Sequence, residues 1–158
     1  MATIIYKPLP SQRKFHFSRK PKVYLSAGLG FGKTYSLCMK LLQLCSENET
    51  LPGGILVPSL KMFKRDVLPT IKEICAENKV DYTYNQQDAA FHFSETDSKV
   101  FVFHSEDHGD SIRGPNLAFG VINEVTMCSK GAFDAFLARI RLKKAKLLQL
   151  AMSGTPEG

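Results

Sequence analysis

Several features that mark other protein classes are missing from this sequence. No stretch approaches the roughly 20 uninterrupted apolar residues of a membrane-spanning helix. The opening MATIIYKPLP lacks the charged-then-apolar layout of a signal peptide, so we expect an intracellular protein. The four cysteines form no CxxC pair and have no histidine cluster nearby, which argues against a zinc site or a disulfide framework. Cys38 and Cys45 lie in an apolar stretch, where we expect both to be buried as small hydrophobes.

What is present is typical of one globular domain. The chain has 158 residues, of which 44% are hydrophobic and 23% charged, close to the average for folded domains and unlike disordered or collagen-like chains. Residues 1–22 contain six Lys or Arg and no acid, while the other 15 basic residues balance all 15 acids. This arm either contacts phosphates or is a solvated tail. We therefore divide the chain into a basic N-terminal arm, 1–22, and a core, 23–158.

Short apolar runs alternate with longer helical patterns, which predicts an α/β fold with a mainly parallel sheet flanked by helices. We expect strands at 23–27, 55–57, 117–123 and 147–152, and helices at 33–47, 60–78 (interrupted near Pro69) and 130–142. Residues 80–104 are expected to form a small antiparallel excursion that leads into a core strand. The segment 52–54 is predicted to be a turn and 105–116 a loop.

The most informative motif is Ala27-Gly-Leu-Gly-Phe-Gly-Lys33-Thr34, which matches GxxxxGK[ST] except for alanine at the first glycine position. Lys33 would contact the β- and γ-phosphates of a nucleotide, and the Thr34 hydroxyl would ligate Mg²⁺. A strand is expected before the motif and a helix after it, which favours a phosphate-binding loop over a chance glycine-rich turn. The backbone can wrap around phosphate oxygens because the loop contains three small residues, Gly28, Gly30 and Gly32.

A second motif is the apolar run that ends in Asn123-Glu124. In P-loop ATPases such a pair is usually Asp-Glu, where the first residue orients the Mg²⁺ shell and the second polarises the attacking water. Asn123 in place of aspartate would contact the metal more weakly or through water, and Glu124 is a candidate general base. The alternative is a strand followed by a solvated glutamate.

Three weaker patterns accompany these motifs. Gln12, about 20 residues before Lys33, carries an amide that can both donate to and accept from an adenine edge. Arg113 lies in the expected loop and could stabilise transition-state charge on a γ-phosphate, in its own subunit or a neighbour's; pairing with Asp107 or Asp110 is its structural alternative. The last expected strand is followed by Ser153-Gly154-Thr155, whose hydroxyls could sense the γ-phosphate; a simple strand-ending turn would look the same.

The order of these motifs, followed by Arg139-Ile-Arg141 and Ser-Gly-Thr-Pro, resembles the ATPase domain of a tailed-phage large terminase. The resemblance spans residues 8–156 and implies a RecA-like P-loop fold of the ASCE type. Where this family's loop often reads GGRGSGKS, the present chain has AGLGFGKT, with Leu29 at the position that is commonly arginine.

The resemblance assigns roles to the residues that match the family's motifs. Gln12 would contact adenine, and Lys33 and Thr34 would bind phosphate and Mg²⁺. Asn123 and Glu124 would form the Walker B pair, with Glu124 catalytic. Arg113 matches an arginine proposed to act on a neighbouring subunit's ATP. Hydrolysis would be coupled to domain movement by Ser153, Gly154 and Thr155.

The same resemblance implies a setting for the protein. Its cofactors would be ATP and Mg²⁺, and its partners double-stranded DNA, a portal protein, a small terminase subunit and further copies in a ring. It would act in the host cell cytoplasm at the procapsid portal, with no membrane partner. The carboxylate cluster of a terminase nuclease does not occur in this sequence, so we expect no nuclease activity from these residues.

Two other functions stay open at the level of sequence. A helicase-like RecA-type translocase would share the glutamine motif, the P-loop and the Ser/Thr motif. A nucleotide-gated binding module would bind Mg·ATP without turnover because Asn123 replaces aspartate. DNA contact could come from the arm or from a second basic cluster, which we expect at a solvated helix end: Arg139, Arg141, Lys143, Lys144 and Lys146.

Overall fold

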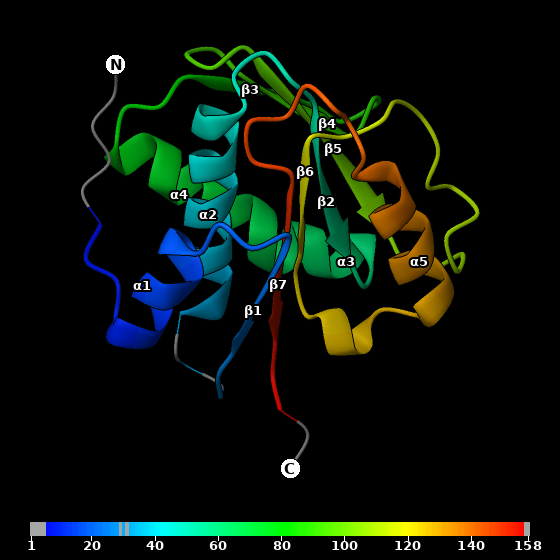
Figure 1. Ribbon diagram of the computed structural model, residues 1–158, viewed down its shortest axis with the longest axis horizontal. Coiled ribbons are helices and arrows are strands. Elements are labelled where there is room, and N and C mark those ends of the chain that lie inside the picture. The colour runs from blue at the N-terminus through cyan, green and yellow to red at the C-terminus, as the bar shows by residue number, and fades with distance from the viewer. Residues whose placement is uncertain (1–5, 29, 31, 157–158) are drawn as a thin grey trace.

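The computed structural model describes residues 6–28, 30 and 32–156 (Figure 1). Its strands are β1 Lys22–Ser26, β2 Gly53–Val57, β3 Tyr82–Asn85, β4 Ala90–Phe93, β5 Ser98–His104, β6 Phe119–Ile122 and β7 Gln149–Gly154. The α-helices are α1 Pro10–Phe17, α2 Lys33–Glu47, α3 Leu60–Met62, α4 Leu68–Glu77 and α5 Lys130–Arg139. Two short segments have other helical geometry: a π-helix, η1 Phe63–Val67, and a 3₁₀ turn, η2 Val125–Met127.

The strands form one seven-stranded sheet in the order β1-β7-β6-β2-β5-β4-β3. Neighbours from β1 through β5 in this order pair in parallel, whereas β4 pairs antiparallel with β5 and with β3. The mainly parallel α/β fold and the antiparallel excursion at 80–104 are therefore confirmed. Because the parallel strands point the same way, their carboxyl ends share one edge of the sheet. That edge lies at the bottom of Figure 1, where α2 begins.

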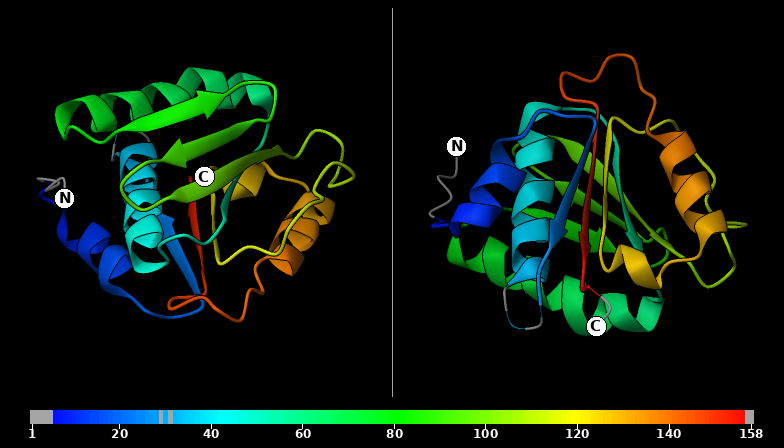
Figure 2. Two further views of the ribbon diagram at one scale, coloured as in Figure 1. Left: turned by 90° about the horizontal axis from the view of Figure 1, so that it is seen from above. Right: turned by 60° about the horizontal axis from the view of Figure 1, so that its bottom comes forward.

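Helices cover both faces of the sheet, as the views in Figure 2 show. Side chains of β2 alternate between the two faces: Ile55 and Val57 belong to the larger apolar cluster, which includes residues of α2 and α4, and Leu56 belongs to the smaller one. Phe136 of α5 is fully buried in the smaller cluster. Burial on both faces explains why β2 and β6 are continuous apolar runs.

The basic arm differs from the solvated tail considered above. Residues 10–17 form helix α1, and its Phe15 is buried in the larger cluster. The main-chain carbonyl of His16 accepts hydrogen bonds from Lys40 Nζ (3.0 Å) and Gln43 Nε2 (2.8 Å) of α2. Gln149 Nε2 of β7 donates to the carbonyls at positions 18 and 20. The described part of the arm, residues 6–22, is thus part of the same folded body, with its Lys and Arg side chains exposed.

The prediction of a turn at residues 52–54 is wrong, because Gly53 and Gly54 belong to β2. A Cβ atom at Gly53 would collide with the Phe119 ring of the neighbouring strand, and one at Gly54 would lie within 2.9 Å of Phe136. These glycines let two large aromatic side chains pack directly against the backbone of the sheet. Both glycines are needed for contacts with residues distant in sequence, so the local Pro-Gly-Gly pattern predicted a turn where the structure has a strand.

The remaining elements largely agree with expectation. Helix α2 has the predicted bounds, and the loop at 105–116 contains no helix or strand in the structure. Cys38 and Cys45 are buried and unpaired, and burial raises the pKa of the Cys45 thiol to about 12. Helix α5 ends at Arg139, so only this member of the second basic cluster lies at the helix end and the other four follow it. Within the described ranges, the helices are too short or too polar to span a bilayer.

Candidate functional site

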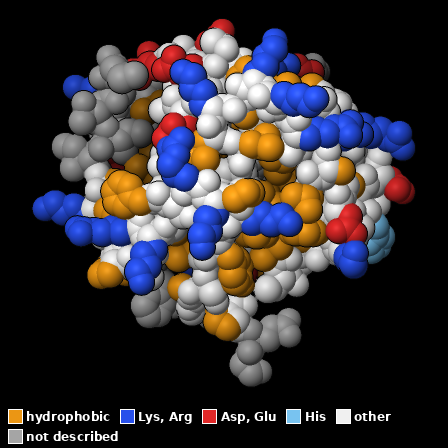
Figure 3. All heavy atoms as spheres, viewed as in Figure 1, with side chains coloured by type: hydrophobic (Ala, Val, Ile, Leu, Met, Phe, Trp, Pro, Cys, Tyr) orange, Lys and Arg blue, Asp and Glu red, His pale blue; other side chains and the backbone are white. Residues whose placement is uncertain are grey.

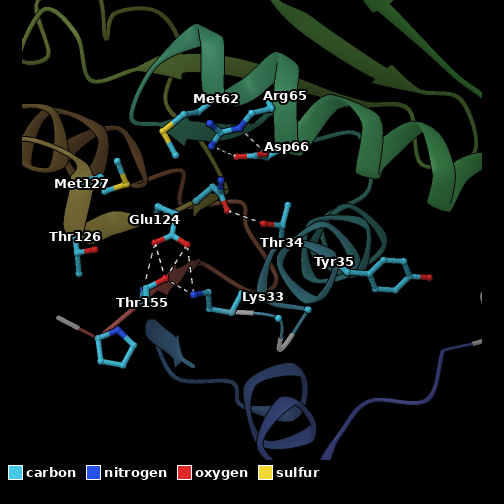
Figure 4. Close-up of a pocket in the computed structure, with 14 residues that line it drawn as sticks. Lys33, Thr34, Tyr35, Met62, Arg65, Asp66, Glu124, Thr126, Met127 and Thr155 are labelled. Atoms are coloured by element: carbon cyan, nitrogen blue, oxygen red, sulfur yellow. Dashed lines mark hydrogen bonds and ion pairs between the residues drawn. The ribbon is translucent and has the colours of Figure 1, made fainter. Parts of the chain in front are cut away.

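A cavity of about 570 Å³ opens at the carboxyl edge of the sheet. Segments that follow four parallel strands line it (Figure 4). Gly30, Gly32, Lys33 and Thr34 come after β1, whereas Met62, Arg65 and Asp66 come after β2. The loops after β6 and β7 complete the lining with Asn123, Glu124, Thr126, Met127, Thr155 and Pro156. Convergence of segments from four strands makes this the binding site that the parallel topology predicts.

Lys33 is the first residue of α2 and is only 7% exposed. Gly32, its N-cap, adopts a left-handed conformation with φ +68°, which glycine tolerates without strain. The Lys33 ammonium donates to the Ala27 carbonyl (2.8 Å) and to the Thr155 hydroxyl, and its Nζ lies 3.5 Å from Glu124 Oε1. A buried lysine at the amino end of a helix is a strong anion-binding arrangement.

Glu124 directly follows β6 and adopts a left-handed conformation with φ +53°. Its carboxylate accepts hydrogen bonds from the Thr155 main-chain N–H (3.2 Å) and from the Thr155 hydroxyl (3.2 Å). A non-glycine residue with positive φ is uncommon, and such strain concentrates at functional positions. Glu124, Thr155 and Lys33 therefore form one connected cluster, with the threonine hydroxyl between the carboxylate and the ammonium (Figure 4).

Asn123 is almost fully buried behind this cluster. Its Oδ1 accepts hydrogen bonds from Thr34 Oγ1 and Ser153 Oγ, both at 3.4 Å. Its Nδ2 is buried without a hydrogen-bond partner among the described residues. The Thr34 hydroxyl and the Asn123 amide oxygen are neutral oxygen ligands of the kind that Mg²⁺ accepts alongside phosphates and water. The described residues contain no cluster of three His, Cys, Asp or Glu side chains that could hold a metal without such help.

Gln12 lies on α1, close to the phosphate-binding loop but outside the cavity lining described above. A Cβ atom at Gly32 would lie 3.9 Å from Gln12 Nε2. The Gln12 amide oxygen accepts from the Leu9 N–H (2.9 Å) and from the Tyr6 hydroxyl (3.2 Å). The Tyr6 hydroxyl also lies 2.9 Å from Ser36 Oγ of α2. These bonds fix the amide beside the loop, and its contact with adenine stays a prediction.

Arg113 is exposed and is not among the described residues that line the cavity. Its Nε donates to the main-chain carbonyl of Asp110 (3.0 Å), and the next residue, Gly114, accepts a bond from the Arg139 guanidinium at the end of α5. This places Arg113 at the amino end of β6, whereas Glu124 follows its carboxyl end. The stretch from 117 to 123 alone spans roughly 20 Å at about 3.3 Å per residue. The structure therefore does not bring Arg113 to the cavity of its own subunit.

The other predicted residues fall into two groups. Ser153 and Gly154 end β7, and a Cβ atom at Gly154 would collide with the Tyr24 hydroxyl of β1. Gly28 lies in the loop after β1, outside any helix or strand, and Leu29 lies outside the described residues. Sequence reasoning missed Arg65 and Asp66, which line the cavity from η1. No motif marks them; the only available clue was Pro69, which interrupts the expected helix at 60–78.

Residues 24–158 match the family model described as "Terminase large subunit, T4likevirus-type, N-terminal". The chain belongs to this terminase family. A comparison with curated proteins gave no significant match.

Solved structures share the fold of this terminase chain. The large terminase of a thermophilic bacteriophage superposes with a TM-score of 0.81 at 18% identity, over 97% of this chain and 40% of that one. The large terminase ATPase domain of Thermus phage P74-26 gives 0.71 at 18% identity, over 97% and 66% of the two chains. The Escherichia coli DEAH/RHA helicase HrpB gives 0.56 at 20% identity, over 95% and 20%.

The first of these terminases has also been solved in complex with ADP and with ATP-gamma-S. At these identities the likeness establishes the fold, a mainly parallel sheet flanked by helices as in RecA-like proteins. The present chain corresponds to about 40% of the length of that terminase.

Proposed function

We propose that this terminase chain is an ATP-hydrolysing motor domain that drives translocation of double-stranded DNA into a procapsid. The observation that carries the proposal is the cluster of Lys33, Thr155 and Glu124 at the edge of the cavity. It joins a phosphate-binding lysine to a candidate general base through Thr155, which directly follows the neighbouring strand β7. This is the arrangement required to sense and hydrolyse a terminal phosphate.

Each residue has a defined part in this proposal. Lys33 and the main-chain N–H groups around Gly28, Gly30 and Gly32 bind the phosphates, and Gln12 contacts adenine. Bound γ-phosphate competes with Glu124 for Lys33, which frees the Glu124 carboxylate to accept a proton from the attacking water. Loss of the Lys33–Thr155 bond transmits the change to β7, and the coupling residues are Ser153, Gly154 and Thr155.

Thr34 and Asn123 would hold Mg²⁺ at this site. Their oxygens lie 3.4 Å apart, and Mg²⁺ commonly keeps one or two protein ligands and takes the rest from phosphates and water. When bound, the ion supplies charge neutralisation between the β- and γ-phosphates. The chain's own contribution is to fix the Thr34 hydroxyl and the Asn123 oxygen in place through α2 and the Ser153 hydroxyl.

Arg113 acts in trans in this proposal. Its position at the amino end of β6 leaves it far from its own cavity but exposed to a neighbouring molecule. When the amino end of one subunit meets the carboxyl end of the next, the contact is heterologous, and such contacts form a ring where the rotation between successive subunits closes. A ring of this kind provides each ATP site with an arginine from its neighbour.

Membership of the terminase family supports the remaining assignments. The partners would be double-stranded DNA, a portal protein and the small terminase subunit, in the host cell cytoplasm at the procapsid. Figure 3 shows Lys and Arg side chains distributed over the face of the molecule seen in Figure 1. The surplus of positive charge, +6 overall, is compatible with a DNA partner.

The decisive measurement is phosphate release from Mg·ATP over a range of protein concentrations, with Lys33→Ala as the blank. Specific activity that rises with concentration is expected, because neighbouring subunits complete the site. Activity independent of concentration would contradict the trans role of Arg113 and favour a self-sufficient, helicase-like translocase.

One alternative rests on a specific observation. Asn123 carries no charge, and its buried Nδ2 has no partner among the described residues. A nucleotide-gated binding module would therefore bind Mg·ATP without releasing phosphate, and Asn123→Asp would restore hydrolysis. If the wild-type chain already hydrolyses ATP above the Lys33→Ala blank, this alternative is excluded.

A further inference from the structure

The described residues that line the cavity include two cations, and each is paired with an acid. Lys33 faces Glu124, as described above. Arg65 binds Asp66 through two hydrogen bonds of 2.8 Å, from Nε to Oδ1 and from Nη2 to Oδ2. The charged side chains among the described lining residues therefore cancel formally. A nucleoside triphosphate that enters the cavity therefore competes with these two acids for the two cations.

Arg65 reaches the cavity because the helix is distorted at this point. It lies in the π-helix η1, between α3 and α4. Pro69 has no N–H, so it cannot donate the α-helical hydrogen bond to the Arg65 carbonyl four residues earlier. Instead the N–H of Leu68 bonds to the carbonyl of Phe63, five residues back. Such π-turns occur frequently at functional sites.

The contact between Arg65 and Asp66 is itself unusual. Adjacent residues on a regular helix point in different directions and do not face one another. Here both side chains extend to the cavity, on the side across from Lys33 and Thr155 (Figure 4). The Arg65 side chain is 62% exposed and that of Asp66 31%. An exposed pair of this kind is weak and is readily exchanged for a more highly charged partner.

Other arginines cannot serve this cavity from within the same chain. Leu29 stands in the phosphate-binding loop at the position where related loops commonly have arginine. Arg113 lies at the opposite end of β6. Arg65 is the only arginine among the described residues that line the cavity. Its planar fork, which already binds one carboxylate with two parallel bonds, fits two phosphate oxygens equally well.

We infer that Arg65 is the arginine with which this chain contacts the γ-phosphate of its own bound ATP, exchanging Asp66 for the phosphate. The inference rests on the proposed function, since it takes the cavity to be the ATP site. ADP lacks the γ-phosphate and leaves the Arg65–Asp66 pair in place. Arg65 therefore discriminates ATP from ADP, and Asp66 holds the guanidinium in position while the terminal phosphate is absent.

Binding of ADP and ATP-gamma-S to the whole chain tests this assignment, measured by calorimetric titration in the presence of Mg²⁺. Arg65→Gln should weaken ATP-gamma-S binding about tenfold or more, the worth of a charge-assisted hydrogen bond, and leave ADP binding unchanged. Arg65→Lys, which keeps the charge but loses the fork, should lose part of this affinity. Lys64→Gln is the matched control, because Lys64 is an exposed cation of the same π-helix outside the lining of the cavity.

The outcomes separate the inference from the proposed function. If the wild-type chain binds both nucleotides and Arg65→Gln leaves their affinity ratio unchanged, the inference is wrong and the proposed function stands. An equal loss of ADP and ATP-gamma-S affinity also overturns it, since it would place Arg65 on the other phosphates. If the wild-type chain binds neither nucleotide, or binds them as Lys33→Ala does, the proposed function fails and the inference with it.

Discussion

The two ends of strand β6 differ in the burial of their charged side chains and in the hydrogen bonds that hold them. At the carboxyl end, Asn123 and Glu124 face a cavity in which Lys33 and Glu124 are buried or partly buried and are held by hydrogen bonds. At the amino end, Arg113 is exposed, and its guanidinium donates to a main-chain carbonyl. A strand of this length separates the base from the arginine by more than either side chain can reach. In the proposed function, one subunit therefore carries the general base and the arginine too far apart to act on the same nucleotide.

The largest expected effect on turnover follows from replacing Arg113 at the amino end of β6. Arg113→Ala should lower kcat by about 10³-fold or more, because an arginine finger stabilises the charge of the transition state. ATP affinity should be unaffected, since Arg113 does not line its own cavity. Steady-state phosphate release and calorimetric titration measure the two quantities, and Lys143→Ala, another exposed cation at this end, is the control.

A mixing experiment decides whether the two ends meet between subunits. Arg113→Ala and Glu124→Gln should each be inactive alone, but a mixture should regain activity at interfaces that combine intact Arg113 with intact Glu124. A mixture that stays inactive although both variants bind ATP would show that the ends do not meet in this way.

Replacing Glu124, the candidate general base at the carboxyl end of β6, should have the next largest effect on turnover. Glu124→Gln is expected to reduce kcat by roughly 10²- to 10⁴-fold, the usual worth of a general base. Glutamine keeps an oxygen that can accept the Thr155 N–H bond, so ATP-gamma-S binding should persist. Asp134→Asn, an exposed acid on α5, serves as the control. Equal loss of binding and turnover would mean that Glu124 is structural.

Neutralising lysines at the amino end should change DNA binding more modestly. Arg139 and Arg141 are bonded to Gly114 and Asn116, whereas three lysines that follow are exposed: Lys143, Lys144 and Lys146. If all three contact phosphates, changing them to glutamine should reduce the slope of log affinity against log salt by about 2 to 3. The matched control replaces three exposed lysines of the α3–α4 segment: Lys61, Lys64 and Lys72. An unchanged slope would remove the amino end from the DNA-binding surface.

The smallest effect concerns a buried polar residue that belongs to neither end. Burial, with the Lys40 ammonium nearby, lowers the pKa of His16 from 6.5 to about 4. Between these values the unfolded chain binds a proton that the folded chain does not, so stability falls as pH falls through this window, by up to about 3 kcal/mol. His16→Gln should flatten this dependence in urea unfolding between pH 4 and 6.5, while phosphate release at pH 7.5 stays unchanged. The same slope in wild type and variant would show that His16 does not titrate in this range.

The site residues that belong to short sequence motifs could be predicted from the sequence. Lys33, Thr34, Asn123, Glu124 and Thr155 were all predicted, and the structure brings them together, because the ends of parallel strands share one edge.

Sequence reasoning failed for features that depend on contacts between segments distant in the chain. Helix α1 is short, and contacts with α2 and β7 hold it in place. Gly53 and Gly54 serve the packing of aromatic rings that are distant in sequence. Arg65 reaches the cavity through a helix distortion, which leaves no mark in a motif scan.

The π-helix has a consequence for how this segment tolerates change in length. Its five residues take up one position more than a regular turn, so α3 and α4 are out of phase by that amount. Deleting a single residue between Arg65 and Pro69 would remove this extra position and leave Ile71 and Ile74 of α4, which are buried in the core, in place. The same deletion would rotate Arg65 away from the cavity by about 100°. Insertions or deletions between Arg65 and Pro69 should therefore move Arg65 out of the cavity. Most substitutions of exposed residues in the same segment should be tolerated.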